Sequence, residues 1–223
     1  MDLILVFLGI ILVIVLYYFL SSGETTVLSN KLDLSIPQTS IPKEKISEPS
    51  SRKYSYEMWL YGYNFNASSN YIVSRTSSSS GKNIGLKFDT SSPKLMLEYT
   101  ATATGVTSIK TVPITDNFPL QTWTHLIVSV DDKYIDIYMN GKLIKSIQDS
   151  IETPSATATI DYGIVNCYLA KLSRSVLPTD PQTAWDKYSA GNGENPFSKY
   201  LSSFGLTMTL KKNDQDYSKV TLF

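Results

Sequence analysis

A segment in the middle of the chain, residues 123–147, constrains the fold more than any other. Three runs of alternating apolar and polar residues (123–130, 134–139 and 142–147) are separated by Asp131-Asp132-Lys133 and by Asn140-Gly141. Asn and Gly tolerate the positive φ angles of a type I′ turn, so Asn-Gly between two such runs is a strong hairpin signal. The segment therefore predicts three consecutive antiparallel strands.

Similar short runs elsewhere predict a mostly β protein. They lie at residues 54–63, 71–75, 84–88, 94–99, 160–172 and 205–211, with a last one at 220–223. Residues 178–188 are the one good helix candidate, because Asp180 can cap the helix and Pro181 suits its first position. Many short strands and one short helix indicate an antiparallel two-sheet jelly-roll sandwich.

The central segment also resembles a known signature. Residues 123–144, WTHLIVSVDDKYIDIYMNGKLI, resemble the hairpin of the concanavalin A-like, laminin-G-like jelly rolls, and the residues that carry the likeness are Trp123, His125, Tyr138, Asn140 and Gly141. The resemblance implies a jelly roll over residues 54–223. Membrane-anchored forms poor in Cys are similar to virion (minor capsid) proteins of large DNA viruses of algae and protists. That similarity implies capsid proteins as partners and a place between an internal membrane and the capsid shell.

The N-terminus predicts a transmembrane helix. Residues 3–20 contain no charge, and fifteen of the eighteen are Leu, Ile, Val or Phe. Eighteen helical residues span about 27 Å, close to the hydrocarbon thickness of a bilayer. The residues expected inside the bilayer include Leu3, Val6, Ile10, Val13, Leu16 and Leu20. We therefore expect residues 1–22 to form a single-pass anchor in a lipid bilayer.

Cleavage as a signal peptide is the alternative, although Asp2 is the only charge upstream and no A-x-A site follows. The nearest cations, at Lys31 and beyond, all follow the apolar run, which places the large domain on the cytosolic side. The single Cys agrees with a reducing compartment.

Residues 23–52 are predicted to be an extended linker, with the sandwich over 53–223. The segment is rich in Ser and Lys and contains Pro37, Pro42 and Pro49, which disfavour a helix. The alternation of Leu28, Leu32, Leu34 and Ile36 leaves a second interpretation open, a short strand added to a sheet edge.

The chemistry-bearing residues do not predict an enzyme. No run of alternate carboxylates like that of retaining glucanases occurs, and Asp132 and Asp136 are the nearest acidic pair in the central hairpin. The lone His125 is expected to be structural, and Cys167 to be a buried thiol. No cofactor is predicted. Calcium stays an open alternative, through loop residues Asp89, Asp116, Asn117, Asp131 and Asp161, which do not form a clustered ligand motif. A net charge of zero argues against a nucleic-acid partner.

Two functions remain. The first is a membrane-anchored structural protein that binds other proteins, as a virion component linking an internal membrane to a capsid. The second is a membrane-anchored lectin that binds glycan from its loops, for which an occupied sequon at Asn66-Ala67-Ser68 would argue.

Overall fold

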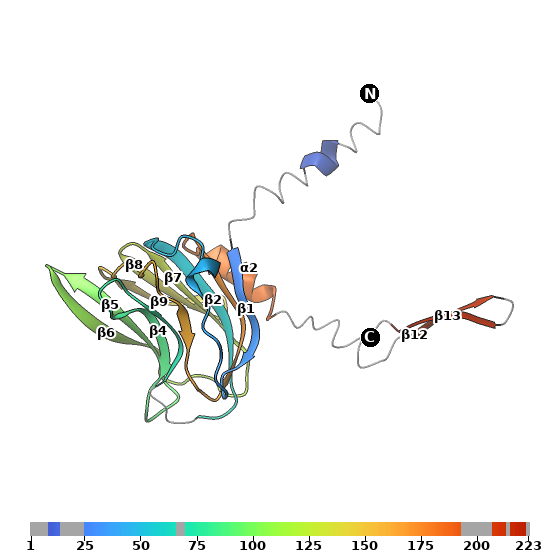
Figure 1. Cartoon of the computed structure of the whole chain (residues 1–223), viewed down its shortest axis with the longest axis horizontal. Coiled ribbons are helices and arrows are strands. Elements are labelled where there is room, and N and C mark those ends of the chain that lie inside the picture. Colours follow the sequence, from blue (N-terminus) through green and yellow to red (C-terminus); the bar gives the residue numbers. More distant parts are fainter. Residues whose placement is uncertain (1–8, 14–24, 66–69, 193–206, 213–214, 222–223) are drawn as a thin grey trace.

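The computed structural model describes residues 9–13, 25–65, 70–192, 207–212 and 215–221. Two antiparallel sheets pack face to face around one cluster of buried apolar side chains (Figure 1). The six-stranded sheet contains, in spatial order, β1 (Thr25–Asp33), β11 (Cys167–Ser175), β2 (Lys53–Gly62), β7 (Thr124–Asp131), β8 (Tyr134–Met139) and β9 (Lys142–Gln148). The five-stranded sheet contains β10 (Ile160–Tyr162), β3 (Tyr71–Thr76), β4 (Lys82–Phe88), β5 (Leu95–Ala103) and β6 (Val106–Thr115). The predicted fold class, a mostly β two-sheet sandwich with one short helix, is confirmed.

The central hairpins form as predicted. β7, β8 and β9 pair in sequence, and Asn140 and Gly141 have φ angles of 50° and 74°, as a type I′ turn requires. The sequence did not predict β6, whose Thr-rich run pairs with β5 in a hairpin that extends beyond the rest of its sheet (Figure 1).

Residues 160–172, predicted as one strand, form parts of two strands in different sheets. β10 pairs with β3 of the five-stranded sheet, whereas β11 lies between β1 and β2 of the other sheet. The chain crosses between the sheets at residues 163–166. A Cβ atom at Gly163 would lie 2.4 Å from the carbonyl oxygen of Tyr71, so a side chain there would block the crossing.

The expectation of a linker at residues 23–52 was wrong for the described part of that segment. β1 pairs with β11 along the edge of the six-stranded sheet, which is the second interpretation of the Leu alternation. Leu34, Ile41 and Ile46 are buried in the main core. The physical reason is that β1 and the segment after it cover apolar surface that the strands of 53–175 would otherwise leave open.

Two buried arginines hold this segment in place. The guanidinium of Arg174 donates to the carbonyl oxygens of Ser47 and Glu48, and that of Arg75 donates to the carbonyl oxygen of Pro49 at 2.7 Å. Both side chains are almost inaccessible to solvent. Charged donors of this kind make stronger hydrogen bonds than neutral ones. The short 3₁₀ helix η1 (Lys43–Lys45) and the residues after it therefore belong to the sandwich.

The helix α2 (Pro181–Ser189) begins as the sequence predicts. The Asp180 side chain accepts hydrogen bonds from the backbone of Gln182 and Thr183, and Pro181 occupies the first turn. Ala184 packs against Ile127 and Tyr138 in a small cluster separate from the main core. The helix therefore lies on the outer face of the six-stranded sheet.

The predicted membrane anchor falls mostly outside the described residues. Residues 9–13, which include Ile10 and Val13, form a short helical segment, whereas Leu3, Val6, Leu16 and Leu20 lie outside the description. Across the described ranges, none of the helices has the length and apolar character needed to cross a membrane. At the other end, β12 (Thr207–Lys212) and β13 (Gln215–Thr221) pair with each other in a two-stranded sheet separate from the two sheets of the sandwich, although the sequence predicts a sandwich that extends to residue 223. The predicted strand at 205–211 overlaps β12, whereas the predicted strand at 220–223 overlaps only the end of β13.

Candidate functional site: an aromatic platform on the six-stranded sheet

Four aromatic side chains gather on the outer face of the six-stranded sheet, at the end where β1 stops. We call this group, Tyr61, Tyr63, Trp123 and Tyr168, the aromatic platform. Tyr61 on β2 lies opposite Tyr168 on β11, and their neighbours Leu60 and Leu169 are fully buried in the core. Because successive side chains of a strand point to opposite faces, the two tyrosines face outward.

The rings of the platform contact one another in series. The ring centroids of Tyr61 and Trp123 are 5.4 Å apart, those of Tyr61 and Tyr168 are 6.1 Å apart, and those of Tyr63 and Tyr168 are 5.3 Å apart. These are normal separations for aromatic pairs. All four side chains remain partly exposed to solvent. The Lys31 ammonium of β1 lies 5.8 Å from the ring centroids of both Trp123 and Tyr168, within the range of a cation–π contact.

Amide side chains lie beside the platform. The Asn166 amide donates to Oδ1 of Asn64 at 2.7 Å, and the Tyr63 hydroxyl lies 3.5 Å from Oδ1 of Asn166. The Gln121 side chain, exposed in the loop before β7, donates to the carbonyl oxygen of Tyr63 at 3.4 Å. Aromatic faces are therefore bordered by groups that can donate and accept hydrogen bonds.

The helix α2 covers the adjoining part of this sheet. His125 is fully buried, and its Nε2 lies 3.2 Å from Oε1 of Glu57. Nζ of Lys187 on α2 lies 3.1 Å from Oε2 of Glu57. The ring of Tyr188 stacks on that of Trp59, with the two ring centroids 5.8 Å apart. Burial alone would raise the pKa of Glu57, but the hydrogen bonds and charges of His125 and Lys187 hold it below its ordinary value. These contacts join the helix to the sheet.

The signature residues divide between two roles. The backbone N–H of His125 donates to Oδ1 of Asn140 at 2.9 Å, so this pair ties β7 to the hairpin turn. The Tyr138 hydroxyl donates to the carbonyl oxygen of Thr179 at 3.1 Å, which anchors the loop before α2. Burial raises the pKa of Tyr138. His125, Tyr138, Asn140 and Gly141 therefore support the fold, whereas Trp123 belongs to the platform.

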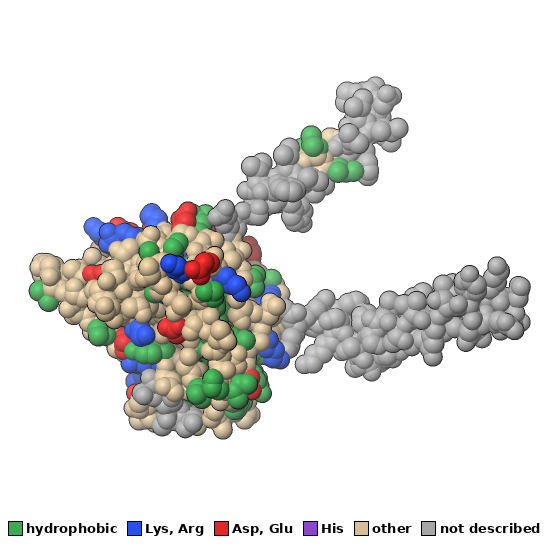
Figure 2. All heavy atoms as spheres, in the orientation of Figure 1, with side chains coloured by type: hydrophobic (Ala, Val, Ile, Leu, Met, Phe, Trp, Pro, Cys, Tyr) green, Lys and Arg blue, Asp and Glu red, His purple; other side chains and the backbone are tan. Residues whose placement is uncertain are grey.

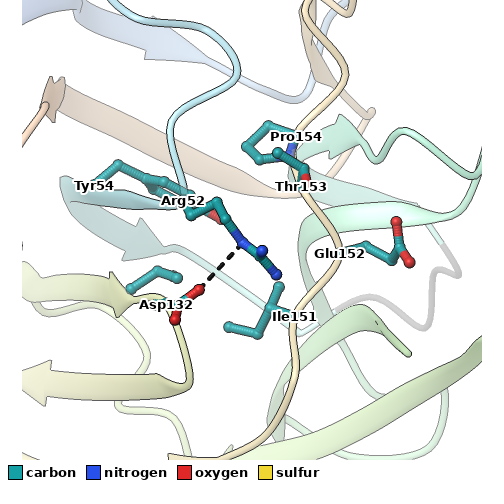
Figure 3. A pocket seen from close by; sticks show the side chains of 8 residues that line it. Arg52, Tyr54, Asp132, Ile151, Glu152, Thr153 and Pro154 are labelled. Carbon is teal, nitrogen blue, oxygen red and sulfur yellow. Dashed lines mark ion pairs between the residues drawn. The ribbon is translucent and has the colours of Figure 1, made fainter. Parts of the chain in front are cut away.

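A crevice at the opposite end of the sandwich does not provide a comparable site. It lies between β2, the β7–β8 turn and residues 151–154, and the space between its side chains does not admit even a water-sized molecule. Figure 3 shows Arg52 and Asp132 pointing toward each other in it, 3.1 Å apart, while Glu152 points away. Ligand pockets usually start at about 300 Å³. The crevice is too small for most ligands, and an ion pair crosses it.

The carboxylates singled out in the sequence have local partners. The side chain of Asp89 accepts from the residues of its own turn, Asp116 pairs with Lys94 at 3.0 Å, and Asp131 pairs with Lys53 at 2.9 Å. Asp161 accepts from Thr159 at 2.7 Å. Within the described ranges, no three His, Cys, Asp or Glu side chains group so that they could hold a metal ion.

Cys167 is fully buried, and burial raises the pKa of its thiol to about 12. The sequon at Asn66 lies outside the described residues. On the outer face of the five-stranded sheet, the Tyr71 hydroxyl donates to Glu98, and the Lys82 and Lys87 ammonium groups lie 4.9 and 5.4 Å from the Tyr71 ring centroid. On the side of the sandwich shown in Figure 2, basic and acidic side chains of the described residues are interspersed.

Sequence reasoning did not find the platform. Its four residues come from β2, β11 and the loops beside β2 and β7, and only the pairing of distant strands brings them together. The one usable signal was the outward parity of Tyr61 and Tyr63 within a strand whose other face is apolar.

The sandwich and its exposed aromatic face define a lectin-like β domain, and the comparisons agree. Residues 37–165, more than half of the chain, match the family model of the concanavalin A-like lectin/glucanases superfamily, of the laminin G type. The chain belongs to this family. The match begins earlier than the predicted 54, consistent with the buried Ile41 and Ile46. Lys31 and Tyr168 of the site lie outside the matched range.

Solved structures similar to the chain have low sequence identity to it. A sialidase from Trypanosoma rangeli has 11% identity and a TM-score of 0.51, with 64% of this chain and 24% of the sialidase covered. The receptor-binding domain of botulinum neurotoxin type G has 17% identity and a TM-score of 0.46, with 63% and 38% covered. The chain thus spans about a quarter to two fifths of these structures. No curated protein sequence matches the chain.

Proposed function

We propose that this protein is a non-catalytic binding module held at a membrane by its N-terminal apolar segment, with the aromatic platform as its binding face. A shared fold does not establish a shared function, so the function has to be argued from the site. The platform is a group of four partly exposed aromatic side chains whose rings contact one another at tilted angles, and it is the surface on which we base the proposal.

The observation that carries the proposal is where the two ends of β1 lie. Only four residues, 21–24, separate the apolar run from Thr25, the first residue of β1. Asp33, the last residue of the strand, is the partner of Tyr168 in the platform. Eight steps along a strand span about 27 Å. An anchor in a bilayer would therefore hold the start of β1 at the surface and the platform well away from it.

This arrangement differs from the extended linker at residues 23–52 that the sequence alone favoured. A strand in place of a thirty-residue linker gives the module a short reach from the membrane. Such a module suits a structural protein that joins a membrane to a layer just above it. A virion in which it connects an internal membrane to the capsid shell is one setting, proposed on the resemblance to virion proteins.

The membrane step is tested with the full chain expressed in cells and membranes washed with alkaline carbonate. The full chain should stay in the pellet, and a variant lacking residues 1–24 should move to the supernatant. Release of the full chain by carbonate would reject the anchor. Protease treatment of sealed vesicles then establishes the side of the domain, which we expect to be cytosolic. In the virion setting, purified particles must contain the chain, and its absence from their proteome would remove that setting.

A further inference from the structure

We propose that two copies of this chain pair along the free edge of β6, so that their five-stranded sheets join into one continuous sheet. β6 is the last strand of its sheet, and with β5 it forms the hairpin that projects from the sandwich (Figure 1). A strand at a sheet edge presents backbone N–H and C=O groups that can pair with a further strand. This surface is separate from the aromatic platform, and the inference does not depend on the binding role of the platform.

The other three edge strands of the sandwich carry features that discourage such pairing. β10 has only three residues. β1 is interrupted by a bulge between Val27 and Ser29, and β9 has an irregular register with β8 and two lysines, Lys142 and Lys145. Short edges, bulges and lysines are devices by which sheets avoid edge-to-edge pairing.

The edge of β6 lacks these features over most of its length. The strand has ten residues, and it follows β5 without a register shift from Val106 to Pro113. Lys110 is the one charged residue of the strand, and its ammonium group lies 2.6 Å from Asp149. β6 is therefore the long, regular and nearly uncharged edge of the sandwich.

The hydrogen bonds of β5 show which residues of β6 direct their backbone groups outward. The N–H of Thr102 and the carbonyl oxygen of Thr100 bond at 2.9 Å to residues 150–152, so both groups point away from β6. Residues opposite each other in an antiparallel pair exchange both hydrogen bonds or neither. The partners of these two residues on β6, Thr107 and Ile109, therefore direct their N–H and C=O groups to the free edge.

The same alternation reaches Thr111 and Pro113. A proline lacks the N–H group, so a sheet tolerates it on an edge strand where that group would face outward. The carbonyl oxygen of Pro113 accepts from Nζ of Lys145 at 2.7 Å, in agreement with an outward direction. The outward groups ahead of Pro113 therefore form an uninterrupted stretch at Thr107, Ile109 and Thr111.

A second copy of β6 fits this stretch in one antiparallel register. A two-fold axis beside Ile109 places Ile109 opposite Ile109 of the second copy, and Thr107 opposite Thr111 in both directions. All of these residues direct their backbone groups to the shared edge, so each opposite pair can exchange two hydrogen bonds. The pairing is isologous, as in most symmetric dimers.

The side chains suit the same register. Ile109 is 64% exposed and would contact its own copy, between two Thr–Thr pairs on the same face. On the other face, Val106, which is 67% exposed, would lie opposite Val112, and Ser108 opposite Lys110. Aliphatic pairs and Thr–Thr pairs across neighbouring strands are stabilising, and no like charges meet.

The neighbouring registers are less favourable. In the proposed register, Pro113 falls opposite Gly105 in the turn of the second copy, where its missing N–H is not needed. A shift of two residues one way would place Lys110 opposite Lys110 and Pro113 opposite Thr107, which adds a like-charge contact and loses a donor. The opposite shift would place Thr111 opposite Gly105 and shorten the paired stretch.

Cysteine cross-linking of the full chain, at high concentration in detergent, tests this register. Opposite Cα atoms of a hydrogen-bonded pair lie about 5.5 Å apart, within the range that a disulfide spans. Ile109→Cys should therefore form a disulfide-linked dimer under mild oxidation. Thr107→Cys alone should not, since four strand residues, about 13 Å, separate its two copies. Thr107→Cys mixed with Thr111→Cys should form the mixed dimer.

The parent chain is the blank in this experiment, because its single cysteine, Cys167, is buried. Dimers of Thr107→Cys alone that are as abundant as those of Ile109→Cys would indicate random collision and overturn the inference. The absence of a disulfide-linked dimer of Ile109→Cys would also overturn it.

A charge exchange at the two-fold axis provides a second test, by sedimentation equilibrium of the full chain. Ile109→Lys would place two like charges opposite each other and should weaken self-association by about tenfold. An equal mixture of Ile109→Lys and Ile109→Glu should recover it. Ile144→Lys is the matched control, because Ile144 is an exposed isoleucine on the lysine-bearing edge strand β9. It should associate like the parent.

Circular dichroism should show all of these variants folded. A parent chain that stays monomeric at every concentration, or self-association that Ile109→Lys leaves unchanged, would mean that β6 is not the dimer edge.

Discussion

At the scale of single residues, Gly141 connects the signature hairpin to the helix. Its φ angle of 74° suits the turn, and a Cβ atom there would lie 3.0 Å from the Trp185 ring and 3.2 Å from the Trp185 Cα. Gly105, at the tip of the β5–β6 hairpin, has a similar φ of 79° but nothing within 4 Å of its Cβ position. Comparing substitutions at the two glycines therefore separates the stability cost of a positive φ angle from the cost of displacing α2.

We predict that Gly105→Ala costs about 1–2 kcal/mol, the ordinary cost of a positive φ in a residue with a side chain. Gly141→Ala should cost a further 1–3 kcal/mol or so, because it also pushes α2 from the sheet. Urea unfolding of both variants measures the difference. Equal losses would mean that the helix gives way without cost and that its contact with the turn is not important.

At the scale of elements, α2 depends on a carboxylate that is kept ionised beneath it. Hydrogen bonds and charges from His125 and Lys187 outweigh burial and lower the pKa of Glu57. A group whose pKa is lowered by folding stabilises the folded state above its unfolded pKa, about 4.3, and loses that contribution as the pH falls further. Acid should therefore loosen the helix from the sheet.

We predict that the free energy of unfolding falls from pH 5 to pH 3 and that Glu57→Gln makes this fall shallower, by removing one titrating group. Chemical denaturation at a series of pH values measures the slopes. Glu44→Gln changes an exposed carboxylate on η1 and serves as the control, with the parent slope retained. A slope for Glu57→Gln equal to that of the parent would contradict the role assigned to Glu57.

Elements with local signals were predictable, and those that depend on distant partners were not. The Asn140-Gly141 turn and the Asp180 cap each lie within a few residues of the structure they specify. β1 depends instead on β11, about 140 residues later, and the alternation of three leucines and Ile36 was too short to choose between strand and spacer. The platform was out of reach for the same reason, because only the register of β2 against β11 and β7 brings its rings together.

The inclusion of residues 25–52 in the sandwich predicts unequal effects of two deletions. Removal of residues 1–24 should leave a folded domain. Removal of residues 1–52 should prevent folding, because it also removes the buried Leu34, Ile41 and Ile46. Each buried aliphatic side chain is worth about 1.5–3 kcal/mol, so their sum approaches the whole stability of a domain. Circular dichroism and size-exclusion chromatography compare the two. A folded, monomeric product of the longer deletion would restore the linker interpretation.

At the scale of the whole molecule, the sandwich has two unlike ends. The end where β1 begins carries the exposed Leu177, two residues beyond Ser175, the partner of Thr25. The end where β1 stops carries the platform, with the exposed Thr122 next to Trp123. Residues 21–24 can span at most about 14 Å, so the end of the sandwich where β1 begins stays near the bilayer surface in an anchored chain. Leu177 should then lie at the lipid headgroups, and Thr122 in water.

This orientation can be measured with an environment-sensitive dye on Leu177→Cys or, as the matched control, on Thr122→Cys, in full chains reconstituted into vesicles. Cys167 should not compete for the dye, because burial raises the pKa of its thiol to about 12. We predict a blue-shifted dye at position 177 that quenchers attached to lipid chains reduce strongly, and a dye at position 122 that only aqueous iodide quenches. Equal lipid quenching at both positions would mean that the domain lies on its side, which would place the platform against the membrane and remove it as an outward binding face.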